Sequence, residues 1–150
     1  MTQFTQATLA ALDDAYRQTL YEVFSDEGVI QLRVNVKSPA LDQLLQRYQQ
    51  KTWALITAYN PHSQTLSALE NSNRNRALAA DLKKLGLPLL KAVGRDESDQ
   101  WPAEESLIVV RLNRADAIYI GQKFAQNAIL YGEIGNPPEL LWPLDFSKIL

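Results

Sequence analysis

Residues 53–94 read WALITAYNPHSQTLSALENSNRNRALAADLKKLGLPLLKAVG, and this stretch decides the fold. Its opening apolar run, WALITAY, predicts a strand that stops before Pro61, because proline has no N–H to donate to a strand ladder. Ser67 and Glu70 have the spacing of a capping box, so a long helix is expected to begin there and to end at Gly86. The closing run, LPLLKAVG, predicts another strand. The stretch is therefore expected to form a strand, a helix and a strand.

The chain continues with the same kinds of element after residue 94. The run SLIVVRL at residues 106–112 predicts a strand, Asn113 can cap a further helix, and NAILYGEI at residues 127–134 predicts a strand. From residue 53 to 134 the order is strand, helix, strand, strand, helix, strand, which is the split βαβ arrangement of ferredoxin-like sheets. This order predicts an α+β fold with a mainly antiparallel sheet and helices packed on it. The alternative is a three-layer α/β sandwich, in which helices cover both faces.

The N-terminal segment adds an extra helix, strand and helix to this core. The first helix is predicted by apolar residues that recur at three- and four-residue steps: Leu9, Leu12, Tyr16, Leu20 and Phe24. Gly28 is expected to end this helix. The run GVIQLRVNVK then alternates apolar and polar residues, which indicates a strand with one wet face. Ser38 and Pro39 suit the N-cap and first position of a short helix.

Composition and charge indicate one soluble globular domain over residues 1–150. The chain is 46% hydrophobic and 21% charged, with a net charge of -2 at pH 7. This charge supplies no general attraction for nucleic acid or anionic lipid, and the strands lack the aromatic motif of RNA-binding sheets. The N-terminus lacks the pattern of a signal peptide, and no run is long enough to span a membrane, so we expect a cytoplasmic protein. Residues 136–150 are expected to form a surface tail or one last short strand.

Several kinds of site are disfavoured by residue usage. The sequence has no cysteine and one histidine, His62, which argues against thiolate chemistry and a histidine-rich metal site. The chain also lacks the glycine-rich motifs that bind phosphates and dinucleotides. We therefore predict neither a metal nor a cofactor.

Asparagines occupy positions on the long helix where apolar residues are expected. The packed face of this helix is defined by three residues: Leu78, Leu82 and Leu85. Asn71 and Asn75 lie on the same stripe, and Arg74 lies at its edge. A buried amide needs a partner, so Asn71 is expected either to bond the backbone of the preceding turn or to face a polar pocket. Arg74 is expected either to anchor an anion or to pair with Glu104 or Glu105.

Five separated blocks of sequence carry a resemblance to a known family. They are ITAYNP, the S-x-x-EN of residues 67–71, LPLLKAVG, WPAEES and KFAQNAI. In this order and spacing, over about residues 53–131, they resemble the bacterial domain of unknown function family 3293, which implies a stand-alone bacterial protein and brings no established activity. The positions that match are Asn60, Pro61, Asn71, Gly94, Trp101, Glu105, Gln126 and Asn127. Ala125 departs from the family pattern, which has glycine there, and its methyl group is expected to narrow a site without abolishing it.

Three functional hypotheses remain open. The first is a binding module for an anionic or amide-bearing small molecule, in a pocket lined by Tyr59, Asn60, Asn71, Arg74, Trp101, Glu105, Gln126 and Asn127. The second is an enzyme that uses Glu104 or Glu105 as a general acid or base in that pocket. The third is a protein–protein interaction module that offers the alternating strand 29–36 to a partner or to a second copy in a homodimer.

Overall fold

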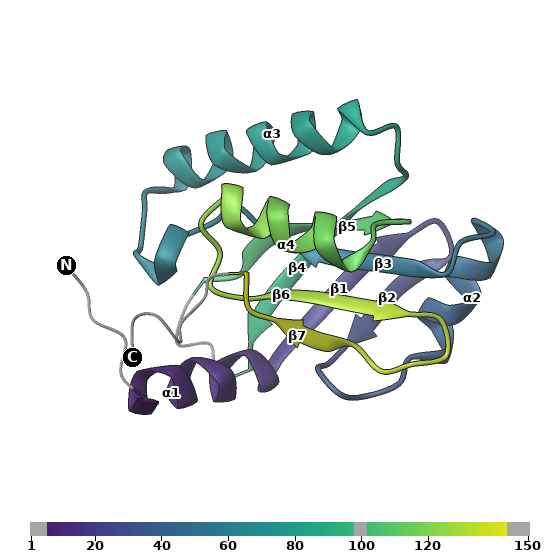
Figure 1. Ribbon diagram of the computed structural model, residues 1–150, viewed down its shortest axis with the longest axis horizontal. Helices are drawn as coiled ribbons and strands as arrows, with labels where there is room; N and C mark the ends of the chain where they lie inside the picture. The colour runs from purple at the N-terminus through teal and green to yellow at the C-terminus, as the bar shows by residue number, and fades with distance from the viewer. Residues whose placement is uncertain (1–5, 98–101, 144–150) are drawn as a thin grey trace.

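The computed structural model describes residues 6–97 and 102–143, and these residues form an α+β fold (Figure 1). The helices are α1 (Gln6–Arg17), α2 (Pro39–Arg47), the 3-10 turn η1 (Pro61–Ser63), α3 (Ala68–Lys84) and α4 (Arg114–Lys123). The strands are β1 (Thr19–Ser25), β2 (Gly28–Leu32), β3 (Thr52–Ile56), β4 (Leu89–Asp96), β5 (Glu104–Val110), β6 (Ile129–Glu133) and β7 (Glu139–Leu141). The predicted α+β class is confirmed.

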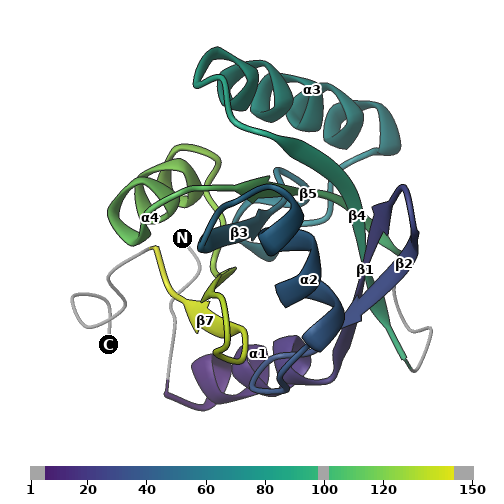
Figure 2. The same cartoon turned by 90° about the vertical axis from the view of Figure 1, so that its right-hand side faces the viewer.

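The strands of the described residues form one sheet in the order β2-β1-β4-β5-β3-β6-β7. Every neighbouring pair is antiparallel, as the sequence predicts. The sheet curls around α2, while α3 and α4 lie on its outer side and α1 lies at the open end of the curl (Figure 2). Helices therefore lie on both faces of the sheet, as in the three-layer sandwich that the sequence analysis gave as the alternative. We call the face toward α2 the inner face and the face toward α3 and α4 the outer face.

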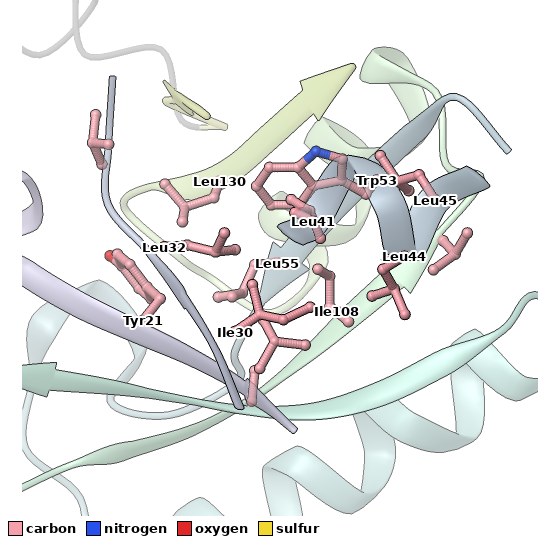
Figure 3. Packing of buried hydrophobic residues seen from close by; sticks show 14 residues of the cluster. Tyr21, Ile30, Leu32, Leu41, Leu44, Leu45, Trp53, Leu55, Ile108 and Leu130 are labelled. Atoms are coloured by element: carbon pink, nitrogen blue, oxygen red, sulfur yellow. The ribbon is translucent and has the colours of Figure 1, made fainter. Parts of the chain in front are cut away.

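The inner face packs against α2 around a buried tryptophan. The side chains of this cluster that Figure 3 labels are Tyr21, Ile30, Leu32, Leu41, Leu44, Leu45, Trp53, Leu55, Ile108 and Leu130. Trp53 is paired across the strands with Gly132, and a Cβ at residue 132 would lie 2.5 Å from the indole nitrogen. Glycine is needed at residue 132 because the indole ring fills that space.

The outer face packs against α3 and α4 in a second cluster. Its members include Ala54, Ile56, Leu78, Leu82, Val109, Ala117, Ile120, Phe124 and Tyr131. Neighbouring residues of β3 thus alternate between the two clusters, with Trp53 and Leu55 facing inward and Ala54 and Ile56 facing outward. Both faces of the strand are buried, which explains why its sequence is a continuous apolar run.

The N-terminal helix is shorter than its periodicity predicts. It ends at Arg17, and the prediction that Leu20 and Phe24 belong to it is wrong, because both lie in β1. Strand β1 has partners on both sides, β2 and β4, and these pairings outweigh a helical pattern in the sequence. Gly28 begins β2 after a tight turn, with φ of 125° that suits glycine.

The remaining boundaries follow the local signals. The Ser38 side chain accepts from the N–H of Leu41 at the start of α2, and Ser67 and Glu70 form the predicted capping box of α3. Asn113 caps α4 as predicted. The strand expected over residues 29–36 ends at Leu32 and lies at the edge of the sheet, and β7 supplies the last short strand. Residues 144–150 of the predicted tail lie outside the described residues.

Candidate functional site

A cavity of about 460 Å³ lies between α1 and the inner face of the sheet. One side of α1 forms a wall with residues spaced at three and four positions: Thr8, Ala11, Leu12, Ala15 and Tyr16. Apolar residues of the strands form much of the opposite wall: Leu55, Ile129, Leu130 and Leu140. The polar residues of the lining include Thr19, Tyr21, Thr57, Tyr59, Asn60, Ser63, Asp96, Glu104, Ser106, Gln126 and Asn127. The cavity is thus an apolar space with polar groups directed to it from several elements.

Asn60 holds the loop after β3 against the cavity. Its backbone is in the left-handed region, with φ of 46°, which asparagine tolerates better than most residues. Its N–H donates to Oδ1 of Asn71 at 2.9 Å, and its Oδ1 accepts from Nδ2 of Asn71 at 2.9 Å and from the N–H of Leu66 at 3.0 Å. Its Nδ2 donates to Oε1 of Glu104 at 2.9 Å. A fixed amide therefore orients the carboxylate.

Glu104 is the half-buried carboxylate at the start of β5. Burial raises the pKa of its carboxyl group, and the hydrogen bond from Asn60 opposes that rise in part. Its charge also acts on Tyr16 and Tyr21, whose pKa values are raised chiefly by their own burial. Gly94 lies opposite Glu104 on β4, and a Cβ there would lie 3.3 Å from Cε1 of Tyr21. The glycine leaves room for this tyrosine ring beside the carboxylate.

Gln126 and Asn127 reach the cavity from the loop between α4 and β6. Nε2 of Gln126 donates to the backbone oxygens of Tyr59 at 3.1 Å and Phe124 at 3.2 Å. Nδ2 of Asn127 donates to Oγ of Ser63 at 2.7 Å, whereas its Oδ1 is buried with no hydrogen-bond partner in the part of the chain that the structure describes. Asn127 is only 2% exposed, so this oxygen is an unmet acceptor in the interior.

Ala125 occupies the position where the resemblance led us to expect glycine. Its φ of 54° lies in the left-handed region, which glycine adopts without the steric cost of a Cβ. Its carbonyl oxygen accepts from the N–H of His62 at 2.8 Å. The departure therefore adds backbone strain beside Gln126, and the contact with His62 helps to hold the loop.

Two predicted site residues on α3 bind the protein backbone instead of lining the cavity. Asn71 is 5% exposed and pins Asn60, which is the first of the two roles expected for it. Arg74 donates from Nε to the oxygen of Ala58 at 2.7 Å and from Nη2 to the oxygen of Phe124 at 2.6 Å. Its donors thus hold two backbone segments together, and among the described residues it forms no ion pair with Glu104 or Glu105.

Asn75 extends this arrangement along the same helix. Its Oδ1 accepts from the N–H of Ala58 at 2.9 Å, and its Nδ2 donates to the oxygen of Glu105 at 3.0 Å. We call Asn71, Arg74 and Asn75 the α3 polar cluster. Its side chains form hydrogen bonds with backbone N–H and C=O groups, which the apolar side chains of the outer cluster cannot do.

The predicted site residues are therefore divided by the structure. The cavity lining brings together Tyr59, Asn60, Gln126 and Asn127, with Glu104 from the pair of carboxylates considered for catalysis. Glu105 is exposed and does not line the cavity. Trp101 lies outside the described residues.

Sequence reasoning missed the contribution of the N-terminal segment to the cavity. Tyr16 and Tyr21 line it, but the predicted long helix treated Tyr16 as one more residue of an apolar stripe. Ser63 and Ser106 are also part of the lining. The turn from α1 into β1 was not predicted from the sequence. At this turn, Oγ1 of Thr19 donates to the oxygen of Ala15 at 2.7 Å. It places the tyrosines on different elements that face the same space.

The described residues contain no group of three or more His, Asp or Glu side chains placed to hold a metal ion. Over the same residues, none of the helices has the length and hydrophobicity that crossing a bilayer would require. The fold and the cavity thus define a small α+β domain with a mixed polar and apolar interior site.

Comparison with known families agrees with the resemblance predicted from the sequence. Residues 56–129 match the family described as "Protein of unknown function (DUF3293)", and this segment is similar to that family. Searches of curated proteins and of solved structures gave no match. The matched segment includes Asn60, Glu104 and Asn127 but not Tyr16, so the wall formed by α1 lies outside it.

Proposed function

We propose that this chain is a binding module for a small molecule, which occupies the cavity between α1 and the inner face. The observation that carries the proposal is the composition of that cavity. Ligand sites typically have volumes of roughly 300–1,000 Å³, mostly apolar walls and a few converging polar groups. A volume of about 460 Å³, with amides and a carboxylate among apolar side chains, fits that description.

The sequence left open whether the ligand is anionic or bears an amide group. The charges of the lining support the second of these. Asp96 and Glu104 are carboxylates, and the described residues that line the cavity include no lysine, arginine or histidine. An anion would lose its hydration there and meet like charge. An amide-bearing ligand can pair with Gln126 and Asn127, so this alternative is favoured over an anionic one.

We also infer a ferredoxin-like core for the segment from β3 to β6. The sheet order β4-β5-β3-β6 and the antiparallel pairing support it, because α3 and α4 then connect strands that are not neighbours. The strands and helices added before and after this core supply the remaining wall of the cavity.

The proposal is tested by screening a fragment library against the full chain by ligand-observed NMR. Ala15→Phe places a ring into the cavity from α1 and is expected to abolish binding of the fragments that the natural chain binds. The matched control is Ala10→Phe on the exposed side of the same helix, which should retain them. Fragments that bind both variants equally, or a screen that yields none sensitive to Ala15→Phe, would contradict the proposal.

A second candidate function is an enzyme that uses Glu104 as general acid or base. Burial raises the pKa of Glu104, which adapts a carboxyl group to hold a proton nearer neutral pH, and Asn60 orients it. Glu105 is exposed outside the lining, so Glu104 is the better candidate of the two. Chemical conversion of a bound fragment, lost in Glu104→Gln while binding persists, would support this function.

A further inference from the structure

The amide groups around the cavity are oriented with their nitrogens toward the protein. Nδ2 of Asn60 donates to Glu104, and Nδ2 of Asn127 donates to Ser63. Within the described residues, both side-chain hydrogen bonds of Gln126 are donated by its Nε2. Among the described residues, Oδ1 of Asn127 has no hydrogen-bond partner, but it is also closed off from solvent. The acceptor that a ligand N–H could pair with is therefore the carboxylate of Glu104, which accepts a hydrogen bond from Asn60.

The charged and aromatic groups of the lining point to the same ligand chemistry. Glu104 brings a carboxylate, and three phenol rings line the cavity: Tyr16, Tyr21 and Tyr59. Carboxylates attract cations, and the faces of aromatic rings add cation–π attraction within about 6 Å. The lining contributed by residues 6–97 and 102–143 holds no lysine, arginine or histidine that could pair with the carboxylate of Glu104.

We propose that the cavity binds an organic cation, with an ammonium or guanidinium head group that donates to Glu104. The hydrocarbon part of the ligand packs against the apolar wall that includes Leu12 and Leu55. This inference rests on the proposed binding function and goes beyond it by assigning the charge of the ligand and its counter-ion. Glu105 is not the counter-ion, because its side chain is exposed outside the lining.

The surroundings of Glu104 explain why a cation is the expected partner. A carboxylate removed from water needs an opposite charge or several hydrogen bonds, and Asn60 supplies one. Asn71 in turn fixes Asn60 through two hydrogen bonds, so Asn60 is a positioning residue for the carboxylate. The missing charge can come from the ligand head group.

The test compares three probes that share a benzene ring: benzylamine, benzamide and benzoate, which carry a cationic, a neutral and an anionic head group. Each is titrated at pH 7 into the full natural chain, and affinity is measured by calorimetry or NMR. We expect benzylamine to bind about tenfold more tightly than benzamide and benzoate to bind most weakly. Tighter binding of benzoate or benzamide would overturn the assignment, and this comparison does not depend on any variant.

The role of Glu104 is tested with Glu104→Gln, which keeps the size of the side chain and its ability to accept from Asn60. Its affinity for benzylamine is expected to fall about tenfold, whereas affinity for benzamide should change less than about twofold. Glu133→Gln is the control, because Glu133 is exposed and does not line the cavity, and it should leave both affinities unchanged. Equal loss for both probes in Glu104→Gln would overturn the role as counter-ion.

The outcomes also separate this inference from the proposed function. Suppose that benzamide or benzoate binds, that Ala15→Phe blocks it, and that benzylamine is the weakest probe. The cation assignment is then wrong, while the binding module stands. If Ala15→Phe changes the affinity of none of the probes that bind, the cavity is not the site and both proposals fail.

Discussion

Two sets of buried polar side chains lie on either side of the loop that follows β3, and they differ in how fully they are paired. The α3 polar cluster bonds to the backbone: Arg74 to Ala58 and Phe124, Asn71 to Asn60. Beside the cavity, Oδ1 of Asn127 has no hydrogen-bond partner among the described residues. Burial of polar groups therefore does not by itself mark a binding site, since the α3 polar cluster is fully explained by its backbone contacts.

Asn60 connects the two sets. Its backbone N–H and Oδ1 bond to Asn71 on one side, and its Nδ2 bonds to Glu104 on the other. The cluster thus supports the site without lining it. Substitutions in the two regions should separate these roles.

The largest expected effect comes from Arg74→Ala. Loss of the guanidinium leaves the oxygens of Ala58 and Phe124 without its hydrogen bonds, and we expect the free energy of unfolding to fall by about 3 kcal/mol. Urea unfolding followed by circular dichroism measures it. Arg76→Ala on the exposed side of α3 is the control and should change stability by less than about 0.5 kcal/mol. Equal losses in the two variants would show that the cluster has no special role.

The second effect concerns Asn71→Ala. Both hydrogen bonds to Asn60 are lost, including the acceptor for a backbone N–H, so we expect a loss of about 2 kcal/mol. The control is Asn73→Ala, since Asn73 lies exposed on the same helix. A loss no greater than that of the control, again by urea unfolding, would contradict the pinning role.

The third effect concerns the stability of a variant of Asn127, which lines the cavity. Asn127→Leu removes an oxygen that is already unpaired together with one hydrogen bond to Ser63. We expect the stability to stay within about 1 kcal/mol of the natural chain, because a binding site keeps polar groups that do not serve the fold. A loss as large as that of Asn71→Ala would mean that Asn127 is structural.

The smallest effect is on the dependence of stability on pH. Burial raises the pKa of folded Glu104 above its ordinary value of 4.5, so the folded state holds this proton more tightly than the unfolded state. The resulting stabilisation is complete below the ordinary pKa and is lost as pH rises through the raised one. Tyr16 and Tyr21, which face Glu104, have pKa values raised by burial and stay protonated there, while Asp96 also lines the cavity.

We therefore expect Glu104→Gln to flatten the decline in stability as pH rises from the ordinary pKa of glutamate. Urea midpoints measured from about pH 4 to about pH 8 follow it. Glu105→Gln, which removes the exposed carboxyl group at the neighbouring position, is the control. A slope in Glu104→Gln that matches this control would contradict the assigned cause.

Much of the fold was predictable because its signals are local. Ser38, the pair Ser67 and Glu70, and Asn113 identified the starts of α2, α3 and α4, since a cap acts over three residues. The end of α1 was not predictable in this way. Leu20 fits the helical stripe, but the pairing of β1 with β2 and β4 decides its conformation.

The candidate site was only partly predictable, for a related reason. Helical spacing showed that Asn71 is buried, and it is. Spacing could not show that its partner would be Asn60 rather than a ligand. It also could not separate Glu104 from Glu105, because these neighbours on a strand face opposite sides and the register selects which of them meets the cavity.

By itself, the sequence determined the class of fold, the capped helices and the burial of amides on α3, because these follow from periodicity and from hydrogen bonds over a few residues. The tertiary structure alone decided which polar atoms are satisfied. The bond from Asn60 to Glu104 spans 44 positions of the chain, and the cavity forms only where α1 meets the curled sheet. Such contacts depend on how distant segments pack, so local patterns do not contain them.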